Sequence, residues 1–134
     1  MSVVAALNTS VLPDPIDKTL QQCEVYLNLT LSGNYGVAAA HGDVLDLSQL
    51  GIPSNQVPTS VFIFEQPTAG NAPTGYSFLY APGTTQANGK MIVLQGGAAN
   101  SNPMAEISQG GAYPGALTAG TANIKAIATF PIGI

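Results

Sequence analysis

The side chains that could carry out chemistry are few in this sequence, and the first to consider is His41, its only histidine. A Ser–His–Asp triad would need a serine and an aspartate from elsewhere in the fold, and the sequence has no Gly-x-Ser-x-Gly nucleophile motif. His41 lies within Ala38-Ala39-Ala40-His41-Gly42, a stretch typical of an exposed loop. We therefore expect a solvated loop histidine and not a catalytic one.

Asp43 and Asp46 form a close acidic pair. On a strand, residues three apart point to opposite faces, so the two carboxylates would not converge as a glycosidase pair does. Calcium needs six to eight oxygen ligands, and the spacing of an EF-hand loop is absent. We expect a turn-capping role for Asp43 after Gly42, and no metal.

Cys23 and the glycine pairs also favour structural roles. Cys23 is the only cysteine, so it cannot form an internal disulfide, and its apolar surroundings are typical of a small buried hydrophobe. Gly96-Gly97 and Gly110-Gly111 lack the spacing of dinucleotide or phosphate loops, so we interpret them as turns. The sequence predicts neither a cofactor nor an enzyme.

Aromatic residues offer one further kind of site, a platform for sugars. The sequence has no tryptophan, and most of its aromatic residues alternate within expected strands, as core and cross-strand residues do: Phe62, Phe64, Tyr76, Phe78 and Tyr80. A carbohydrate-binding module stays an alternative, with Tyr35 and Tyr113 as the residues through which to test it.

Charge is the most unusual property of the chain. Only 7% of its 134 residues are charged, against about 25% in ordinary proteins, with three lysines, no arginine and a net charge of −4. That balance argues against binding to nucleic acid or to anionic membranes, because both need clustered cations. No apolar run reaches 18 residues, and the first residues lack the basic segment of a signal peptide. A weakly charged polar surface suits a subunit that its neighbours largely cover.

The elements that would position these residues are strands. Apolar and polar residues alternate from Cys23 to Leu31, which is the strongest strand signal in the chain. Asn88-Gly89 is a hairpin signal, and residues 110–120 are rich in glycine and alanine and are expected to be irregular. Shorter strands are expected near residues 44–47, 60–65, 76–80, 90–95, 105–108 and 124–130. This spacing predicts an all-β, antiparallel β-sandwich, jelly-roll-like in topology.

Residues 1–20 differ from the rest and are expected to form an extended N-terminal arm beside a sandwich domain at residues 21–134. Pro13 and Pro15 force extended backbone on the residues before them, and a short helical turn is expected around residues 17–22. The arm has more apolar residues than a solvated tail would have, so we expect it to bind a partner subunit through Val3, Val4, Leu7, Val11, Leu12 and Ile16.

Several stretches together resemble small structural proteins of tailed bacteriophages: residues 29–35, 42–47, 75–83, 88–90 and 111–114. The resemblance is to capsid decoration, or cement, proteins. It implies a β-sandwich body, oligomers that sit on the outer surface of the capsid, and reinforcement of the shell. The implied partners are the major capsid protein and copies of the chain itself, as a homodimer or homotrimer. A tail or head-fibre component is the nearest alternative.

Overall fold

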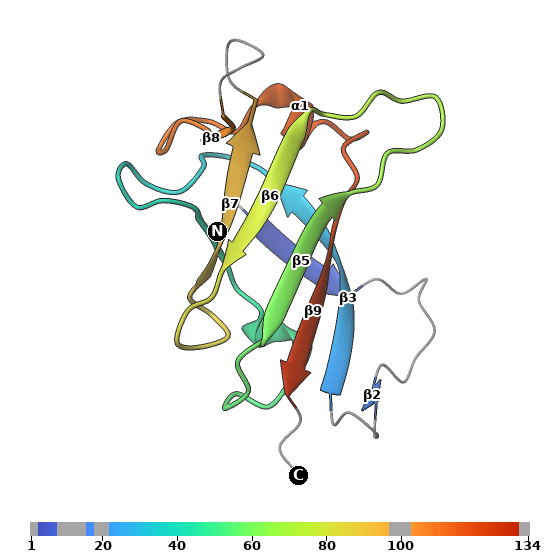
Figure 1. The fold of residues 1–134 in the computed structure, drawn as a ribbon, viewed down its shortest axis with the longest axis vertical. Helices are drawn as coiled ribbons and strands as arrows, with labels where there is room; N and C mark the ends of the chain where they lie inside the picture. Colours follow the sequence, from blue (N-terminus) through green and yellow to red (C-terminus); the bar gives the residue numbers. More distant parts are fainter. Residues whose placement is uncertain (1–2, 8–15, 18–21, 97–102, 132–134) are drawn as a thin grey trace.

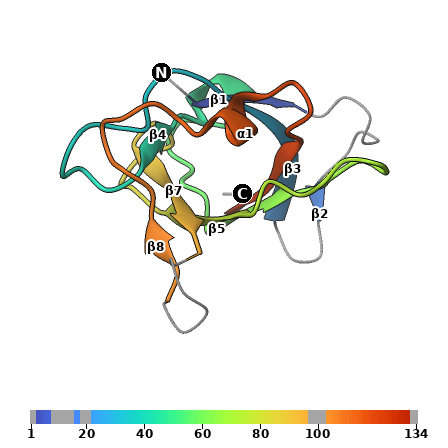
Figure 2. The same ribbon diagram turned by 90° about the horizontal axis from the view of Figure 1, so that it is seen from above.

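The computed structural model describes residues 3–7, 16–17, 22–96 and 103–131, and these form two antiparallel sheets (Figure 1). The prediction of an all-β sandwich is confirmed. Seen from above, the strands surround a single centre (Figure 2). The jelly-roll detail stays a prediction.

The larger sheet is built on β3 (Gln22–Leu31), which pairs along its length with β9 (Ile124–Pro131). β5 (Ser60–Glu65) pairs with the other side of β9. β1 (Val3–Leu7) and β2 (Ile16–Asp17) both pair with β3, which gives the order β1-β3-β9-β5 with β2 beside β3.

The smaller sheet has β7 (Gly89–Gln95) at its centre. β6 (Tyr76–Ala81) pairs with β7 on one side, and β4 (Asp43–Leu45) and β8 (Ala105–Glu106) also pair with it. β5 lies beside β6 and β1 beside β4, so the two sheets meet along both seams. The short helices are η1 (Ser48–Leu50) and α1 (Gly115–Thr118).

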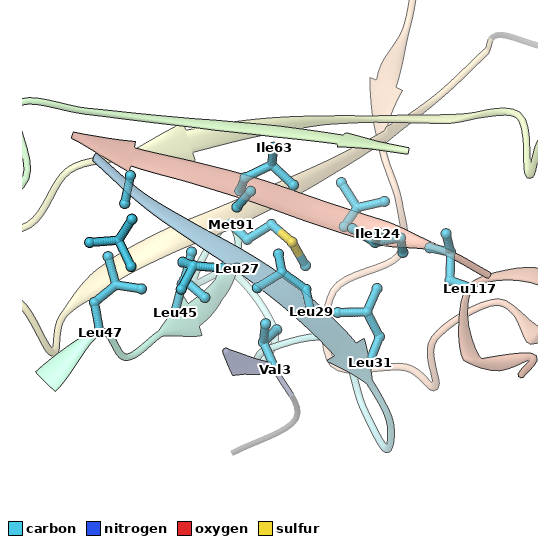
Figure 3. Close-up of a cluster of buried hydrophobic side chains, with 14 of the residues drawn as sticks. Val3, Leu27, Leu29, Leu31, Leu45, Leu47, Ile63, Met91, Leu117 and Ile124 are labelled. Carbon is cyan, nitrogen blue, oxygen red and sulfur yellow. The ribbon is translucent and has the colours of Figure 1, made fainter. Parts of the chain in front are cut away.

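The core lies between the sheets and follows from the alternation in the sequence. β3 and β9 each bury every second residue, because successive side chains of a strand point to opposite faces. Figure 3 shows these side chains meeting others from β1, β4, β5 and β7. The buried set from the two long strands is Cys23, Val25, Leu27, Leu29, Leu31, Ile124, Ala126, Ala128 and Phe130.

The described part of the expected N-terminal arm belongs to the sandwich itself. β1 pairs with β3 from Val3 opposite Leu31 to Leu7 opposite Leu27, and Val3 is buried in the core. The expected boundary at residues 20–21 therefore does not separate β1 from the domain, because main-chain pairing and apolar burial join them. The helical turn expected around residues 17–22 is wrong at its ends, since Asp17 lies in β2 and Gln22 in β3.

Two further details differ from the sequence analysis. The hairpin signal at Asn88-Gly89 does mark the β6–β7 hairpin, but the connection runs over residues 82–88. Asn88 stabilises this longer loop, as its side chain accepts the N–H of Thr85 and donates to the hydroxyl of Thr84. Within the stretch expected to be irregular, residues 115–118 form α1, and the side chain of Leu117 in this helix is buried.

Candidate functional site

The densest group of polar contacts surrounds the carboxylate of Glu106 on β8. Its Oε1 accepts the hydroxyl of Tyr35 at 2.7 Å and the backbone N–H of Gly42 at 2.8 Å. Its Oε2 lies 2.8 Å from Nδ1 of His41 and accepts Nε2 of Gln109 at 3.1 Å. One carboxylate therefore holds three separate stretches of chain together.

These contacts set the ionisation of Glu106 and Tyr35. Partial burial would raise the pKa of Glu106, but the hydrogen bonds from His41, Tyr35 and Gly42 outweigh it and leave that pKa below its usual value. Burial, together with the nearby negative charges of Glu106 and Asp43, raises the pKa of the Tyr35 hydroxyl far above its usual value. Glu106 is accordingly a charged acceptor and Tyr35 a neutral donor at neutral pH.

A buried polar pair, Tyr113 and Asp43, lies next to the contacts of Glu106. The hydroxyl of Tyr113 donates to Oδ2 of Asp43 at 2.6 Å, and both residues are buried. The rings of Tyr113 and Tyr35 meet edge to face with their centroids 5.5 Å apart. The hydroxyl of Tyr35 also accepts the buried backbone N–H of Val93, so the network reaches the central strand of the smaller sheet.

The network fixes the loop between β3 and β4, which has unusual backbone geometry. Ala39 and His41 have positive φ values of 63° and 47°, which non-glycine residues rarely adopt. Lys90 holds the carbonyl of Ala40 through its ammonium group at 2.8 Å, and Gln109 accepts the N–H of His41 at 3.0 Å. These contacts hold a strained loop in place. We call the group that makes them the Glu106 clamp; it consists of Tyr35, His41, Gly42, Lys90, Glu106 and Gln109.

The candidate chemical residues of the sequence lie in separate settings in the structure. The side chain of His41 is 72% exposed, as expected of a loop histidine, although its bond to Glu106 was not expected. Asp43 is buried against Tyr113, whereas Asp46 accepts the N–H and hydroxyl of Ser48, so the two carboxylates serve different structures. Within the described residues, no cluster of three or more histidine, cysteine or acidic side chains could hold a metal.

The aromatic residues divide in a way that the sequence did not indicate. Tyr35 and Tyr113, the residues through which a sugar site would be tested, are buried and cannot stack on a sugar. Phe62 is instead 65% exposed on β5, and its ring stacks on that of Phe64 at 5.3 Å. The expectation that Phe62 belongs to the core is therefore wrong, because its register places it on the outer face of the larger sheet.

That outer face is the second candidate site, and the register defines it. Tyr26, Ile127 and Phe62 stand side by side on β3, β9 and β5, and Asn28, Lys125 and Phe64 form the next row. On β1, Val4 lies opposite Thr30 and is 54% exposed. We call this surface the outer face; it consists of Val4, Glu24, Tyr26, Asn28, Thr30, Phe62, Phe64, Lys125, Ile127 and Thr129.

The six residues predicted to bind a partner do not share one environment. Val3 is buried in the core and Val4 lies on the outer face. Leu7 lies at the end of β1 opposite Leu27, and Ile16 lies on β2 opposite Cys23. Val11 and Leu12 lie outside the described residues. The structure thus leaves Val4 as the described member whose side chain is shown to be exposed.

Comparison with known proteins gives no relative: no family model matches the chain, and neither a curated protein nor a solved structure does. In the described part of the chain, no helix is long and apolar enough to cross a membrane.

Sequence reasoning missed both the Glu106 clamp and the outer face. Glu106 lies between Ala105 and Ile107 in the sequence, and nothing in its spacing links it to Tyr35 or His41. The outer face was missed because residues 61–64 of β5 are all apolar, so the sequence does not show that Phe62 and Phe64 lie on the face opposite to the buried Ile63.

Proposed function

We propose that this chain is a structural virion protein that decorates a bacteriophage capsid and stabilises it by binding the shell of the major capsid protein. The observation that carries this proposal is the exposure of large apolar side chains on a domain with very few charges. The proposed location on the capsid surface rests on the resemblance of the sequence to cement proteins.

Exposed apolar side chains occur in several parts of the domain. Phe62 and Val4 lie on the outer face, Val37 lies in the clamped loop at 67% exposure, and Leu79 lies on β6. A single free domain with little charge gains nothing from such side chains, because each leaves apolar area in water. A subunit that contacts neighbours on more than one side would bury them.

The Glu106 clamp supports the same proposal. It holds the loop that carries Val37 in one conformation through Tyr35, His41 and Gln109. Fixing a loop before binding lowers the entropy cost of the contact. The clamp therefore prepares a surface for binding and needs no chemical step.

Reinforcement of a shell follows from burial alone. A decoration protein that contacts two capsid subunits at once must be displaced before those subunits separate, so its binding free energy adds to the stability of the shell. Apolar contacts of ordinary interface size suffice for this role.

The test is cosedimentation with expanded heads that lack this chain, prepared from the phage whose genome encodes it. We expect saturable binding with a fixed number of copies per head and a higher temperature of head disruption. The variant Val37→Ser should weaken binding, while Ala72→Ser in the exposed loop between β5 and β6 serves as a control. Absence of binding to heads would contradict the proposal, and binding to tails would favour the alternative of a tail or fibre component.

A further inference from the structure

We propose that the outer face packs against the same face of a second copy of this chain, around a two-fold axis. The inference deepens the proposed function, because it assigns the surface through which decoration subunits would pair, but it concerns the isolated protein and can fail separately. It rests on how apolar and charged side chains are placed on β3, β9 and β5.

The centre of the outer face is apolar. Tyr26, Ile127 and Phe62 form one row across the sheet, and Phe64 stacks on Phe62 from the next row. Cross-strand neighbours on one face lie about 5 Å apart, so these side chains are continuous. The row is the natural position for an axis that crosses the strands.

The charged side chains of the outer face, Glu24 and Lys125, are placed on opposite sides of that row, whereas Glu65 of β5 belongs to the opposite face, with Ile63. Glu24 pairs with Thr129 beyond one side of Ile127, and Lys125 lies beyond the other side. The ammonium of Lys125 donates to Oδ1 of Asn28 at 2.8 Å, which draws the positive charge from β9 towards β3. The face therefore carries one negative end and one positive end.

A two-fold axis along the central row brings unlike ends together. It places Ile127 over Ile127 and Phe62 over Phe62, and it places Glu24 of one copy over Asn28 of the other. Because Asn28 holds the Lys125 ammonium, each Glu24 meets a Lys125 of the other copy. The contact is self-complementary, with two equivalent ion pairs around an apolar centre, as an isologous interface requires.

The size of the face fits a weak dimer. Four strands about 4.8 Å apart and eight residues at about 3.3 Å each give roughly 500 Å² in plan. Weak specific interfaces bury up to about 600 Å² per partner. Two twisted sheets that pack face to face in this way form an aligned sandwich, with about 10 Å between the sheets.

The test is analytical ultracentrifugation of the purified chain over a range of concentrations, with charge-reversal variants. We expect a reversible monomer–dimer equilibrium. Glu24→Lys and Lys125→Glu should each weaken dimerisation by about tenfold or more, and the double variant should restore it, because it rebuilds both ion pairs with their signs exchanged. Phe62→Ser should weaken dimerisation by about thirtyfold, while Leu79→Ser on β6 should leave it unchanged.

Restoration in the double variant separates a contact from a folding defect, since a misfolded single variant would not be rescued by a second reversal. A monomer at all concentrations, a trimer, or a dimer that ignores both reversals would overturn the inference. Loss of head binding by Phe62→Ser with dimerisation unchanged would also overturn it, because the face would then belong to the shell contact. A dimer with these sensitivities that does not bind heads would uphold the inference and refute the proposed function.

Discussion

The hydroxyl of Tyr35 donates to Oε1 of Glu106 at 2.7 Å and joins two residues that lie 71 positions apart in the sequence. The same hydroxyl accepts the buried N–H of Val93 at 3.0 Å. Through these two bonds the loop after β3, the strand β7 and the short strand β8 share one polar centre. The exposed Val37 lies on the loop that this centre holds.

Replacing Tyr35 with phenylalanine should therefore destabilise the domain. The change removes the hydroxyl that donates to Glu106 and accepts the N–H of Val93. Tyr35 is fully buried, so water cannot replace that hydroxyl. Leaving buried polar groups unsatisfied costs about 1 to 3 kcal/mol. Urea denaturation would measure the loss, and Tyr26→Phe is the control, because the Tyr26 hydroxyl bonds to Glu24 at the exposed surface and its removal should cost less than about 0.5 kcal/mol. Equal effects of the two changes would argue against the clamp.

The clamp should also shape the dependence of stability on pH. Because the pKa of Glu106 is lowered in the folded state, its contribution is complete above the unfolded value of about 4.3 and is lost as the pH falls through the lower folded value. Glu106→Gln should be less stable than the wild type at pH 7, and its stability should fall less between pH 5 and pH 3. Thermal unfolding followed by circular dichroism at these pH values would measure both effects. Parallel curves for the two proteins would contradict the assignment.

β1 offers a matched pair of neighbouring valines. Val3 is 1% exposed in the core, whereas Val4 is 54% exposed on the outer face. Val3→Ala should lower the free energy of unfolding by about 1 to 3 kcal/mol through lost burial and a cavity, and Val4→Ala by less than about 0.5 kcal/mol. If both changes leave stability untouched while weakening attachment to heads, β1 acts as an arm and not as part of the core.

Tyr80 and Gly89 make a contact that a double-mutant cycle can test. A Cβ on Gly89 would overlap the hydroxyl oxygen of Tyr80, and that hydroxyl is buried with no hydrogen-bond partner among the described residues. Gly89→Ala should therefore destabilise the domain by about 1 to 3 kcal/mol. Tyr80→Phe should be neutral or stabilising and should relieve much of the cost of Gly89→Ala.

Gly120→Ala is the control for this cycle, because a Cβ there meets nothing within 4 Å. It should change stability by less than about 0.5 kcal/mol. Additive effects of the Tyr80 and Gly89 changes would show that the two residues do not share the space assigned to them.

The fold could be predicted where the apolar–polar pattern within a single strand identifies its buried face. The alternation from Cys23 to Leu31 predicts which side chains face the core, and all of its apolar positions are buried in the structure. β1 was not predictable in this way, because only Val3 of its described side chains is fully buried and the prolines that follow it suggest a separate segment. What places β1 in the sheet is pairing with β3, a long-range contact that its own residues do not reveal.

The candidate surfaces were harder to predict for the same reason. Glu106 acquires its role from Tyr35 and His41, which are more than sixty positions away, and no local pattern records such a contact. Phe62 resembles any strand aromatic until the register with Ile127 shows which face it occupies. Sequence periodicity gives the two faces of a strand, but the packing of the sheets decides which of them is covered.

The most direct test of the central claim is to ask whether this chain is part of the particle. The proposed function requires that a phage genome encodes this chain, and virions of that phage should be purified and examined by quantitative mass spectrometry and by image reconstruction at subnanometre resolution. The account predicts a fixed copy number that matches the shell symmetry, with β-sandwich density on the outer capsid surface. Purified infectious particles that contain no peptide of this chain would contradict it.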